Sequence, residues 1–325
     1  MRILLTHTPD MRANYYGERA LAGLRKLGEV QLHEGADALA PSGLVTAARG
    51  MDFIIADRLT AGPAEVFAAL PELKAVLRCA VDIRNIDVAA ASAAGILVTQ
   101  AKPGFVVSVS ELTVGFLVDL ARGVSRSTAD YHAGRTPAVR VGRQLSGSTI
   151  GLIGYGAIGR YLAPIVAALG MDVLIADPHV EVDDARFRKV SLETLLAEAD
   201  HVVCLAVATE ATENLIDAHA LRRMKPDAVF INVSRGNLVD EGALAVAIDE
   251  GIIAGAAMDV GRALDQMPTP SLAVRSNIIA TPHIGGLTPP AIEAQALDTV
   301  EQVRELVAGK VPHGAVNAEH WLRRV

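Results

Sequence analysis

The 325-residue chain is poor in cysteine and contains no long apolar run. Its two cysteines, Cys79 and Cys204, each lie within an apolar stretch, which favours buried, reduced thiols over a disulfide framework and predicts a reducing compartment. No run reaches the roughly eighteen apolar residues that a membrane-spanning helix needs. Only a short apolar stretch precedes Thr6 and His7, so no secretory signal is predicted and we expect a cytoplasmic protein.

The chain also lacks a basic stripe. Its formal net charge is −7 and its pI is near 5.7, so nucleic acid and anionic membrane surfaces are not expected partners. No metal site is predicted. Hydrophobic residues make up 51% of the chain and charged residues 21%, which is enough apolar material for two ordinary cores and argues against disorder.

A glycine-rich turn stands between a predicted strand and a predicted helix in the middle of the chain. Residues 150–159 read IGLIGYGAIG, and the apolar spacing of YLAPIVAALG after them predicts a helix that ends at Gly170. Gly154 permits a tight turn, Gly156 lets the backbone approach a pyrophosphate, and Gly159 allows close packing of helix on strand. The amides at the helix N-terminus then remain free to bind the anion.

Asp177 completes this unit. It ends the next apolar run, MDVLIAD, at the distance from Gly154 where a carboxylate accepts hydrogen bonds from an adenosine ribose. The same carboxylate would repel a 2′-phosphate. The turn and the acid together predict that the chain binds NAD in preference to NADP.

Strands and helices are predicted to alternate along the chain. The first hundred residues contain the strand-like runs RILLT, EVQLH, DFIIA, KAVL and ILV, with helical segments near 15–27, 63–70 and 86–93. A second series contains STIGLIG, DVLIAD, HVVCLAV, AVFINVS, GAAMDV and NIIATPH, with helices over 191–199, capped by Ser191, and 241–250, stopped by Gly251. This pattern predicts an α/β protein with two doubly wound, largely parallel sheets and a ligand cleft between them, at the carboxyl ends of the strands.

Two long helices are predicted at the connections between the sheets. Residues 108–133 read as one continuous helix, which would make a rigid linker with one face available to a second subunit. The last helix, 289–308, is expected to return to the first domain.

Four segments together resemble one family. The GxGxxG turn, INVSRGNLVDEGAL, AAMDVGR and ATPHIGGLT are similar to the D-isomer-specific 2-hydroxyacid dehydrogenases, which include phosphoglycerate, glycerate, D-lactate and formate dehydrogenases. The resemblance implies a Rossmann NAD-binding domain over 101–287, inserted into a flavodoxin-like substrate domain formed by 1–100 and 288–325. It also implies NAD as cofactor, interconversion of a D-2-hydroxy acid and its 2-oxo acid, and a homodimer through the long helix.

Arg235 and His283 match the family's catalytic positions. A guanidinium after the strand AVFINVS can reach a substrate's keto oxygen and carboxylate together, which polarises the carbonyl and fixes its orientation. Hydride arriving at a carbonyl carbon must be matched by a proton at oxygen, and an imidazole can both donate and accept that proton. Thr281 and Pro282 before the histidine and two glycines after it predict an open, rigid turn.

The third catalytic position departs from the family. Members usually carry a glutamate that pairs with the histidine, and the matching residue here is Leu264. Asp265 substitutes for it if the segment GRALDQMP bulges by one residue, and otherwise it is a solvated loop acid. Gln266 is the alternative neutral partner, since the formate dehydrogenase branch uses glutamine.

The predicted substrate loop departs as well. The family offers backbone amides to the substrate carboxylate from a glycine-rich turn, which here reads RCAVDIRNID and places Ala80, Val81 and Asp82 at the substrate. Asp82 would repel a carboxylate unless Arg78 or Arg84 neutralises it. Otherwise the substrate carries a hydroxyl or cationic group, or the aspartate side chain points away.

The resemblance also implies the residues that contact the cofactor. Asp259 matches the aspartate that hydrogen-bonds the nicotinamide carboxamide, although an acid at a strand end is also a common helix cap. The complete set of implied cofactor contacts is Gly154, Tyr155, Gly156, Ala157, Ile158, Gly159, Asp177, Val207, Val233, Ser234, Asp259, Gly285 and Gly286.

Two alternative functions remain open. A non-catalytic NAD-sensing scaffold, like the corepressors that share this fold, is favoured by the missing glutamate and disfavoured by the presence of both Arg235 and His283. A formate- or phosphite-oxidising enzyme is suggested by Gln266. The identity of the acid substrate does not follow from the sequence.

Overall fold

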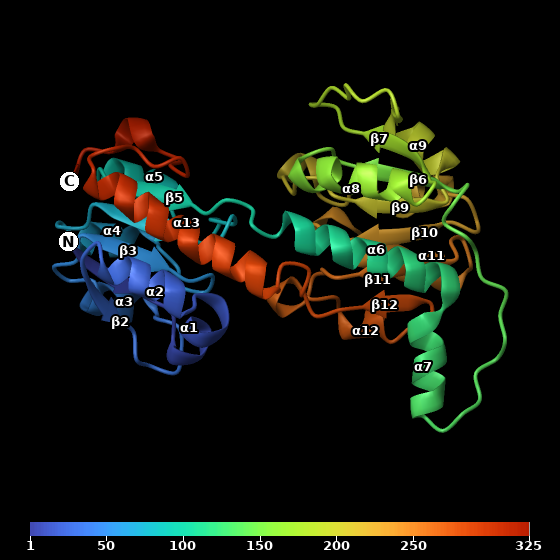
Figure 1. Cartoon of the computed structure of the whole chain (residues 1–325), viewed down its shortest axis with the longest axis horizontal. Helices are drawn as coiled ribbons and strands as arrows, with labels where there is room; N and C mark the ends of the chain where they lie inside the picture. The colour runs from blue at the N-terminus through green and yellow to red at the C-terminus, as the bar shows by residue number, and fades with distance from the viewer. Residues whose placement is uncertain (325) are drawn as a thin grey trace. The chain divides into compact units, whose positions relative to one another are not determined.

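The computed structural model describes residues 1–324 as two compact units, each with its own sheet and core (Figure 1). Unit 1 consists of Met1–Gly104 and the chain from Pro289 onward, and unit 2 consists of Phe105–Thr288. All paired strands of both sheets run parallel, which confirms the predicted α/β class. Within residues 1–324, no helix is long and apolar enough to cross a membrane.

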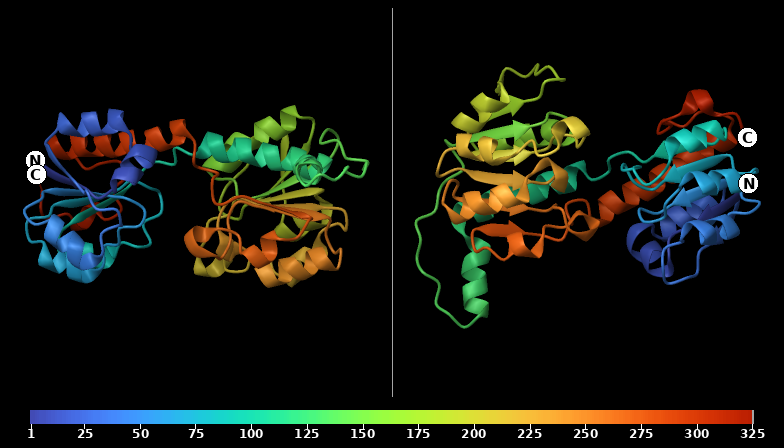
Figure 2. Two further views of the ribbon diagram at one scale, coloured as in Figure 1. Left: turned by 90° about the horizontal axis from the view of Figure 1, so that it is seen from below. Right: turned by 180° about the vertical axis from the view of Figure 1, so that it is seen from behind.

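Unit 1 has a five-stranded sheet in the order β2-β1-β3-β4-β5. Its strands are β1 (Arg2–Leu5), β2 (Glu29–Leu32), β3 (Phe53–Ala56), β4 (Ala75–Arg78) and β5 (Leu97–Gln100). Its helices are α1 (Pro9–Tyr15), α2 (Glu18–Arg25), α3 (Pro41–Ala47), α4 (Ala64–Ala69), α5 (Val88–Ala93) and α13 (Pro289–Val307). Side chains of β3 alternate between the faces: Phe53 and Ile55 pack with α2 and α13, and Ile54 packs with α3 and α4 (Figure 2).

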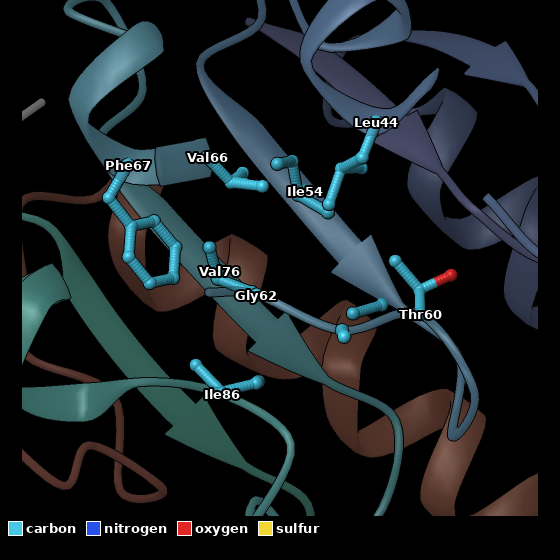
Figure 3. Close-up of a pocket in the computed structure, with 10 residues that line it drawn as sticks. Leu44, Ile54, Thr60, Gly62, Val66, Phe67, Val76 and Ile86 are labelled. Carbon is cyan, nitrogen blue, oxygen red and sulfur yellow. The ribbon is translucent and has the colours of Figure 1, made fainter. Parts of the chain in front are cut away.

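A small apolar cavity lies in the core of unit 1, on the face that carries α4 (Figure 3). Its volume is about 10 Å³, which is room for one water molecule at most. Leu44, Ile54, Phe67 and Val76 line it, with the Thr60 hydroxyl at one end. The cavity is therefore a packing gap, too small for a substrate.

Unit 2 has a seven-stranded sheet in the order β12-β11-β10-β9-β6-β7-β8. Its strands are β6 (Thr149–Ile153), β7 (Asp172–Ala176), β8 (Phe187–Lys189), β9 (His201–Cys204), β10 (Val229–Asn232), β11 (Gly255–Met258) and β12 (Ile278–Ala280). Its α-helices are α6 (Val106–Arg122), α7 (Val124–His132), α8 (Ala157–Ala168), α9 (Leu192–Glu198), α10 (Ala218–Arg223), α11 (Glu241–Asp249) and α12 (Pro270–Ala273).

Local signals account for several of these boundaries. Ser191 caps α9 by accepting a hydrogen bond from the Thr194 amide, as predicted. Gly251, with a φ of +67°, follows the end of α11. Cys79 and Cys204 are both buried and unpaired, which confirms the prediction of free thiols. Burial raises the pKa of each thiol to about 12.

The predicted continuous helix over 108–133 is wrong. Gly123 adopts the left-handed conformation, with a φ of +66°, and separates α6 from α7. Five short elements were not predicted, namely α1, α3, β8, α10 and α12. Each has at most two buried residues, so its apolar periodicity is weak.

Candidate functional site

The glycine-rich turn of unit 2 connects β6 to the N-terminus of α8 (Figure 1). Gly154 has a φ of +100°, and a Cβ at this position would lie 2.8 Å from the main-chain oxygen of Leu205. A Cβ on Gly159 would lie 2.7 Å from the main-chain oxygen of Gly154. These two glycines therefore let the backbone turn tightly and the helix begin close to the strand.

Gly156 leaves an open cradle at the N-terminus of α8. Apart from Gly156 itself and its neighbours in the chain, no described atom lies within 4 Å of the position that a Cβ would take there. As the N-cap of the helix it provides no side chain to bond the amides of the first turn. Ala157 and Ile158, in that turn, thus present main-chain N–H groups to an anion. The cradle fits the pyrophosphate of a dinucleotide.

The turn lies where the strand order of the sheet reverses. β6 has β7 on one side and β9 on the other, so the connections from it run in opposite directions. In open parallel sheets, ligands bind in the crevice at the carboxyl ends of the strands at this point. Gly154 approaches Leu205, which follows β9, so the ends of β6 and β9 lie close together at this point.

Asp177 follows β7 and is tied directly to the glycine-rich turn. Its carboxylate accepts hydrogen bonds from the Tyr155 amide at 2.8 Å and from the His179 amide at 2.9 Å. The Tyr155 ring is buried, and the Arg160 guanidinium lies 4.7 Å from its centroid. The turn thus holds the carboxylate beside the cradle, where an adenosine ribose is expected.

The other predicted cofactor residues follow the neighbouring strands. Val207 comes after β9 and is 77% exposed, whereas Val233, directly after β10, is buried. The Ser234 hydroxyl donates to the main-chain oxygen of Ala206 at 2.6 Å, so it links the ends of β9 and β10. These residues all belong to the carboxyl edge of the sheet.

Asp259 follows β11, and its buried carboxylate holds the turn after β12 in place. It accepts hydrogen bonds from the Thr281 hydroxyl at 2.6 Å and from the amides of Ile284 and Gly285, each at 2.8 Å. Its main-chain oxygen accepts from the His283 amide at 2.9 Å. The side chain that was predicted to contact the nicotinamide therefore also clamps the turn that carries the histidine.

His283 is held in an unusual backbone conformation, with a φ of +55°. Its Nδ1 atom lies 2.8 Å from the main-chain oxygen of Asp265. A carbonyl oxygen can only accept, so Nδ1 carries the proton, and in the neutral ring Nε2 is the acceptor. His283 therefore contacts the main-chain oxygen of residue 265 through its Nδ1 atom.

The loop that supplies this carbonyl is a tight turn after β11. Asp265 and Gln266 both have left-handed backbones, with φ values of +56° and +58°. Leu264, at the position of the family's usual glutamate, is 86% exposed. This turn brings the backbone carbonyl of residue 265 to the histidine.

Arg235 follows β10 and is half-buried. Its main-chain oxygen accepts from the Asn232 side chain at 2.9 Å, and its Nη1 donates to the Ser234 oxygen at 2.7 Å. A Cβ on the next residue, Gly236, would overlap the main-chain oxygen of Gly261. Only glycine permits this approach, which brings the Arg235 turn against the loop after β11.

The predicted substrate loop lies in unit 1, after β4. The Asp82 carboxylate forms an ion pair with Arg84, with Nη2 to Oδ2 at 2.6 Å and Nε to both carboxylate oxygens at 3.0 Å. Buried Arg78 donates its Nε to the Asp82 main-chain oxygen at 3.1 Å, and the Ala80 oxygen accepts from Ala101. Val81 is half-buried between them.

Sequence reasoning missed a buried polar cluster where the strand order of unit 1 reverses, between β1 and β3. Asp57 accepts hydrogen bonds from the hydroxyls of Thr6 and Thr60, each at 2.5 Å. His7, which was predicted to be solvated or structural, is 2% exposed. Burial is the largest cause that lowers its pKa to about 4. The available signal was the place of Thr6 and Asp57, each directly after an apolar strand.

No group of three or more metal-ligating His, Cys, Asp or Glu side chains occurs among residues 1–324.

Comparison with known proteins gives consistent matches. The family described as "D-isomer specific 2-hydroxyacid dehydrogenase, NAD binding domain" matches residues 114–285. The (S)-sulfolactate dehydrogenase of Chromohalobacter salexigens is 38% identical over 269 residues, which cover 80% of this chain and 86% of that protein. The D-3-phosphoglycerate dehydrogenase of Mycobacterium leprae is 33% identical over 94% of this chain, which spans only 58% of that relative's length.

Solved structures show the same architecture. The TT0316 protein of Thermus thermophilus superposes with a TM-score of 0.87 at 31% identity, over 97% of this chain and all of that one. A D-2-hydroxyisocaproate dehydrogenase, at 23% identity, superposes with a TM-score of 0.87 over 98% of this chain and all of its own. The match to the latter concerns the fold alone.

Proposed function

Because this chain belongs to the D-isomer-specific 2-hydroxyacid dehydrogenases, we propose that it interconverts a D-2-hydroxy acid and its 2-oxo acid by means of Arg235 and His283. NAD is the cofactor of the family, and when bound it supplies or accepts the hydride at the substrate's C2. The observation that supports the proposal most strongly is the geometry of His283, whose Nδ1 is fixed by a main-chain oxygen at 2.8 Å.

The residues proposed to bind NAD follow strands of the unit 2 sheet at its carboxyl edge. The N-terminal amides of α8 would hold the pyrophosphate, and the Asp177 carboxylate would accept hydrogen bonds from the adenosine ribose. Its negative charge favours NAD over NADP. Asp259, Gly285 and Gly286 would lie toward the nicotinamide end.

Arg235 would bind the substrate and polarise its carbonyl. Its guanidinium carries a permanent charge and several donors in one plane, which suits a keto oxygen next to a carboxylate. The turn is rigid because Asn232 and the glycine contact at 236 fix its backbone. A donor that is fixed in advance stabilises the developing charge on oxygen without reorganisation.

His283 would transfer the proton. In reduction of the 2-oxo acid, Nε2 of the protonated ring gives its proton to the carbonyl oxygen as the C=O double bond becomes a C–O single bond. In oxidation, neutral Nε2 takes the hydroxyl proton. The hydrogen bond from Nδ1 to the Asp265 main-chain oxygen stays in place in both directions, so the ring keeps its orientation.

We propose further that the substrate carries a second acidic group. The relatives compared above are named for sulfolactate and phosphoglycerate, each of which has one. In the predicted substrate loop, the ion pair with Arg84 offsets the charge of Asp82, so the aspartate does not oppose an anionic substrate. Ala80, Val81 and Asp82 remain the residues proposed to contact it.

The chain is also proposed to act as a homodimer in a reducing compartment. Val118, Val124 and Tyr131 leave an apolar surface exposed along α6 and α7, which the second copy would cover. The two buried, unpaired thiols are consistent with a reducing environment.

A panel of 2-oxo acids, with and without a second acidic group, tests the proposed function. NADH consumption is expected with at least one acid, and NADPH is expected to support it poorly. Tight binding of NADH without turnover of any 2-oxo acid would contradict the proposal and favour the NAD-sensing scaffold. Oxidation of formate or phosphite in its place would favour the third alternative, which involves Gln266.

A further inference from the structure

The carbonyl that holds His283 belongs to a loop without regular hydrogen bonding to the sheet. Residues 261–269 connect the end of β11 to α12, with a short 3₁₀ turn (Leu264–Gln266) at the tip. Something must fix this loop, because a displaced carbonyl would free the imidazole to rotate or to change its tautomer.

A buried carboxylate fixes both ends of the loop. Glu241, the first residue of α11, is 9% exposed. Its Oε1 accepts from the Arg262 amide at 2.9 Å, and its Oε2 accepts from the Thr269 hydroxyl at 2.6 Å. Both oxygens are thus satisfied by the loop, which offsets the cost of burying the charge.

The loop lies directly against that carboxylate. A Cβ on Gly261 would overlap Oε1 of Glu241, so only glycine lets the chain pass. Between the clamped ends, the Gly261 amide donates to the Gln266 oxygen at 2.7 Å, and the Ala263 amide donates to the Met267 oxygen at 2.9 Å. A displacement at either end would therefore be transmitted to the tip.

We propose that Glu241 is a positioning residue for His283. It acts on the histidine indirectly, through the main-chain carbonyl of Asp265. This inference rests on the proposed function of His283. The carboxylate sets the place of the loop, the loop sets the place of the carbonyl, and the carbonyl sets the tautomer and orientation of the ring.

The chain offers a matched control in the residue next to it. Asp240 caps the same helix: its side chain accepts from the Ala243 amide at 3.0 Å, within α11 and away from the loop. Loss of either side chain disturbs the start of α11, but only loss of Glu241 removes contacts to the loop. The Arg262 guanidinium, which donates to the main-chain oxygens of Val239 and Asn237, still holds one end of it. Asp240→Ala therefore reports what helix destabilisation alone does.

The experiment compares wild type with Glu241→Ala, Glu241→Gln and Asp240→Ala in kcat across pH, NADH affinity and thermal unfolding. We expect Glu241→Ala to lower kcat for reduction by roughly ten- to a hundredfold, as is typical when an orienting partner is lost. The high-pH limb of its profile should move to lower pH, while NADH affinity stays within about threefold of wild type. Glu241→Gln, which keeps an oxygen for the Arg262 amide, should recover most of the activity.

A second readout does not depend on turnover. Nitrogen-detected NMR of the His283 ring should show a protonated Nδ1 in wild type and in Asp240→Ala, and a mixture of tautomers in Glu241→Ala. If Glu241→Ala does not fold, Thr269→Val replaces it, with Thr269→Ser as the conservative control.

A folded Glu241→Ala variant with the wild-type pH profile and tautomer overturns the inference. The inference is also overturned if Asp240→Ala changes the pH profile and the His283 tautomer as much as Glu241→Ala does. If wild type reduces no 2-oxo acid, the proposed function fails, but the tautomer measurement still decides whether Glu241 controls the ring.

Discussion

At the scale of single residues, the most informative position is Asp265. Its side chain was one of two candidates, with that of Gln266, to replace the family's glutamate as the partner of His283. The structure gives the histidine a contact with the main-chain oxygen of the same residue, at 2.8 Å. A left-handed backbone at 265 places that oxygen, so the contact depends on conformation more than on the identity of the side chain.

Substitution of Asp265 separates these two roles. Asp265→Asn keeps the carbonyl and tolerates a positive φ, so kcat for reduction is expected to change by less than about threefold. Asp265→Val should cost activity and stability, because a β-branched residue strains the left-handed conformation by about 1–2 kcal/mol. Steady-state kinetics and urea unfolding of both variants measure this. If kcat falls more than tenfold in Asp265→Asn, the Asp265 carboxylate is needed as a partner of His283 and this prediction is contradicted.

His7 predicts how stability depends on pH. Its pKa is lowered to about 4, mainly by burial; Arg78 and Arg12 lower it further, while Asp57 opposes them. In the unfolded chain the ring binds a proton below about pH 6.5, so falling pH favours unfolding from there down to about 4. Between pH 6.5 and 5 the free energy of unfolding should fall by about 1.5 kcal/mol on account of this group.

Urea unfolding of wild type, His7→Gln and His320→Gln across this pH range checks the His7 assignment. His320 is exposed and serves as the control. The pH slope should flatten only in His7→Gln. Part of it will remain, because burial also lowers the pKa of His201. An unchanged slope in His7→Gln would show that the ring is already free to ionise in the native state.

Residue identities indicate the cofactor turn more directly than they indicate the partner of His283. Gly154, Gly156 and Asp177 carry their physical requirements in their own chemistry, since a positive φ, an open approach and an acceptor are properties of the residue type. The Nδ1 atom of His283 contacts a backbone carbonyl, a group that every residue possesses. The sequence therefore offered only side-chain candidates, and Glu241, twenty-four residues before Asp265, carried no signal for the loop.

At the scale of elements, the strands were predicted better than the helices. Strands of a parallel sheet are buried on both faces and read as apolar runs, as β3 and β9 do. The helix expected over 108–133 has apolar spacing throughout, yet it breaks at Gly123. The sequence contains the glycine but not the left-handed conformation that it adopts there.

The strand–turn–helix element of the cofactor site predicts different outcomes for two of its glycines. Gly154→Ala places a Cβ against the Leu205 oxygen at a positive φ, so it should destabilise the protein and weaken NADH binding. Gly156→Ala meets no described atom, so thermal unfolding without cofactor should stay close to wild type while NADH affinity falls at least tenfold. Nicotinamide fluorescence and calorimetry measure both. Full NADH affinity in Gly156→Ala would show that the cradle does not hold the pyrophosphate.

At the scale of the whole molecule, the exposed apolar residues of α6 and α7 support the prediction that the protein is a homodimer. Sedimentation equilibrium should give twice the chain mass of 34.1 kDa. The double substitution Val124→Asp and Tyr131→Asp should shift the protein toward monomer, because charges would be buried in the interface. Val274→Asp, at a position 80% exposed next to α12, is the matched control. A monomeric wild type at micromolar concentration would refute the assembly.

The central claim is that Arg235 and His283 perform the chemistry while the glycine-rich turn and Asp177 bind the cofactor. The most direct test measures NADH affinity and 2-oxo acid turnover together in wild type, Arg235→Ala, His283→Ala and the control Arg275→Ala, which removes a half-buried arginine paired with Asp249. We predict that Arg235→Ala and His283→Ala each lower kcat/KM at least about a hundredfold while NADH affinity stays within about threefold of wild type. Wild-type turnover in both of those variants on the best substrate would contradict the account.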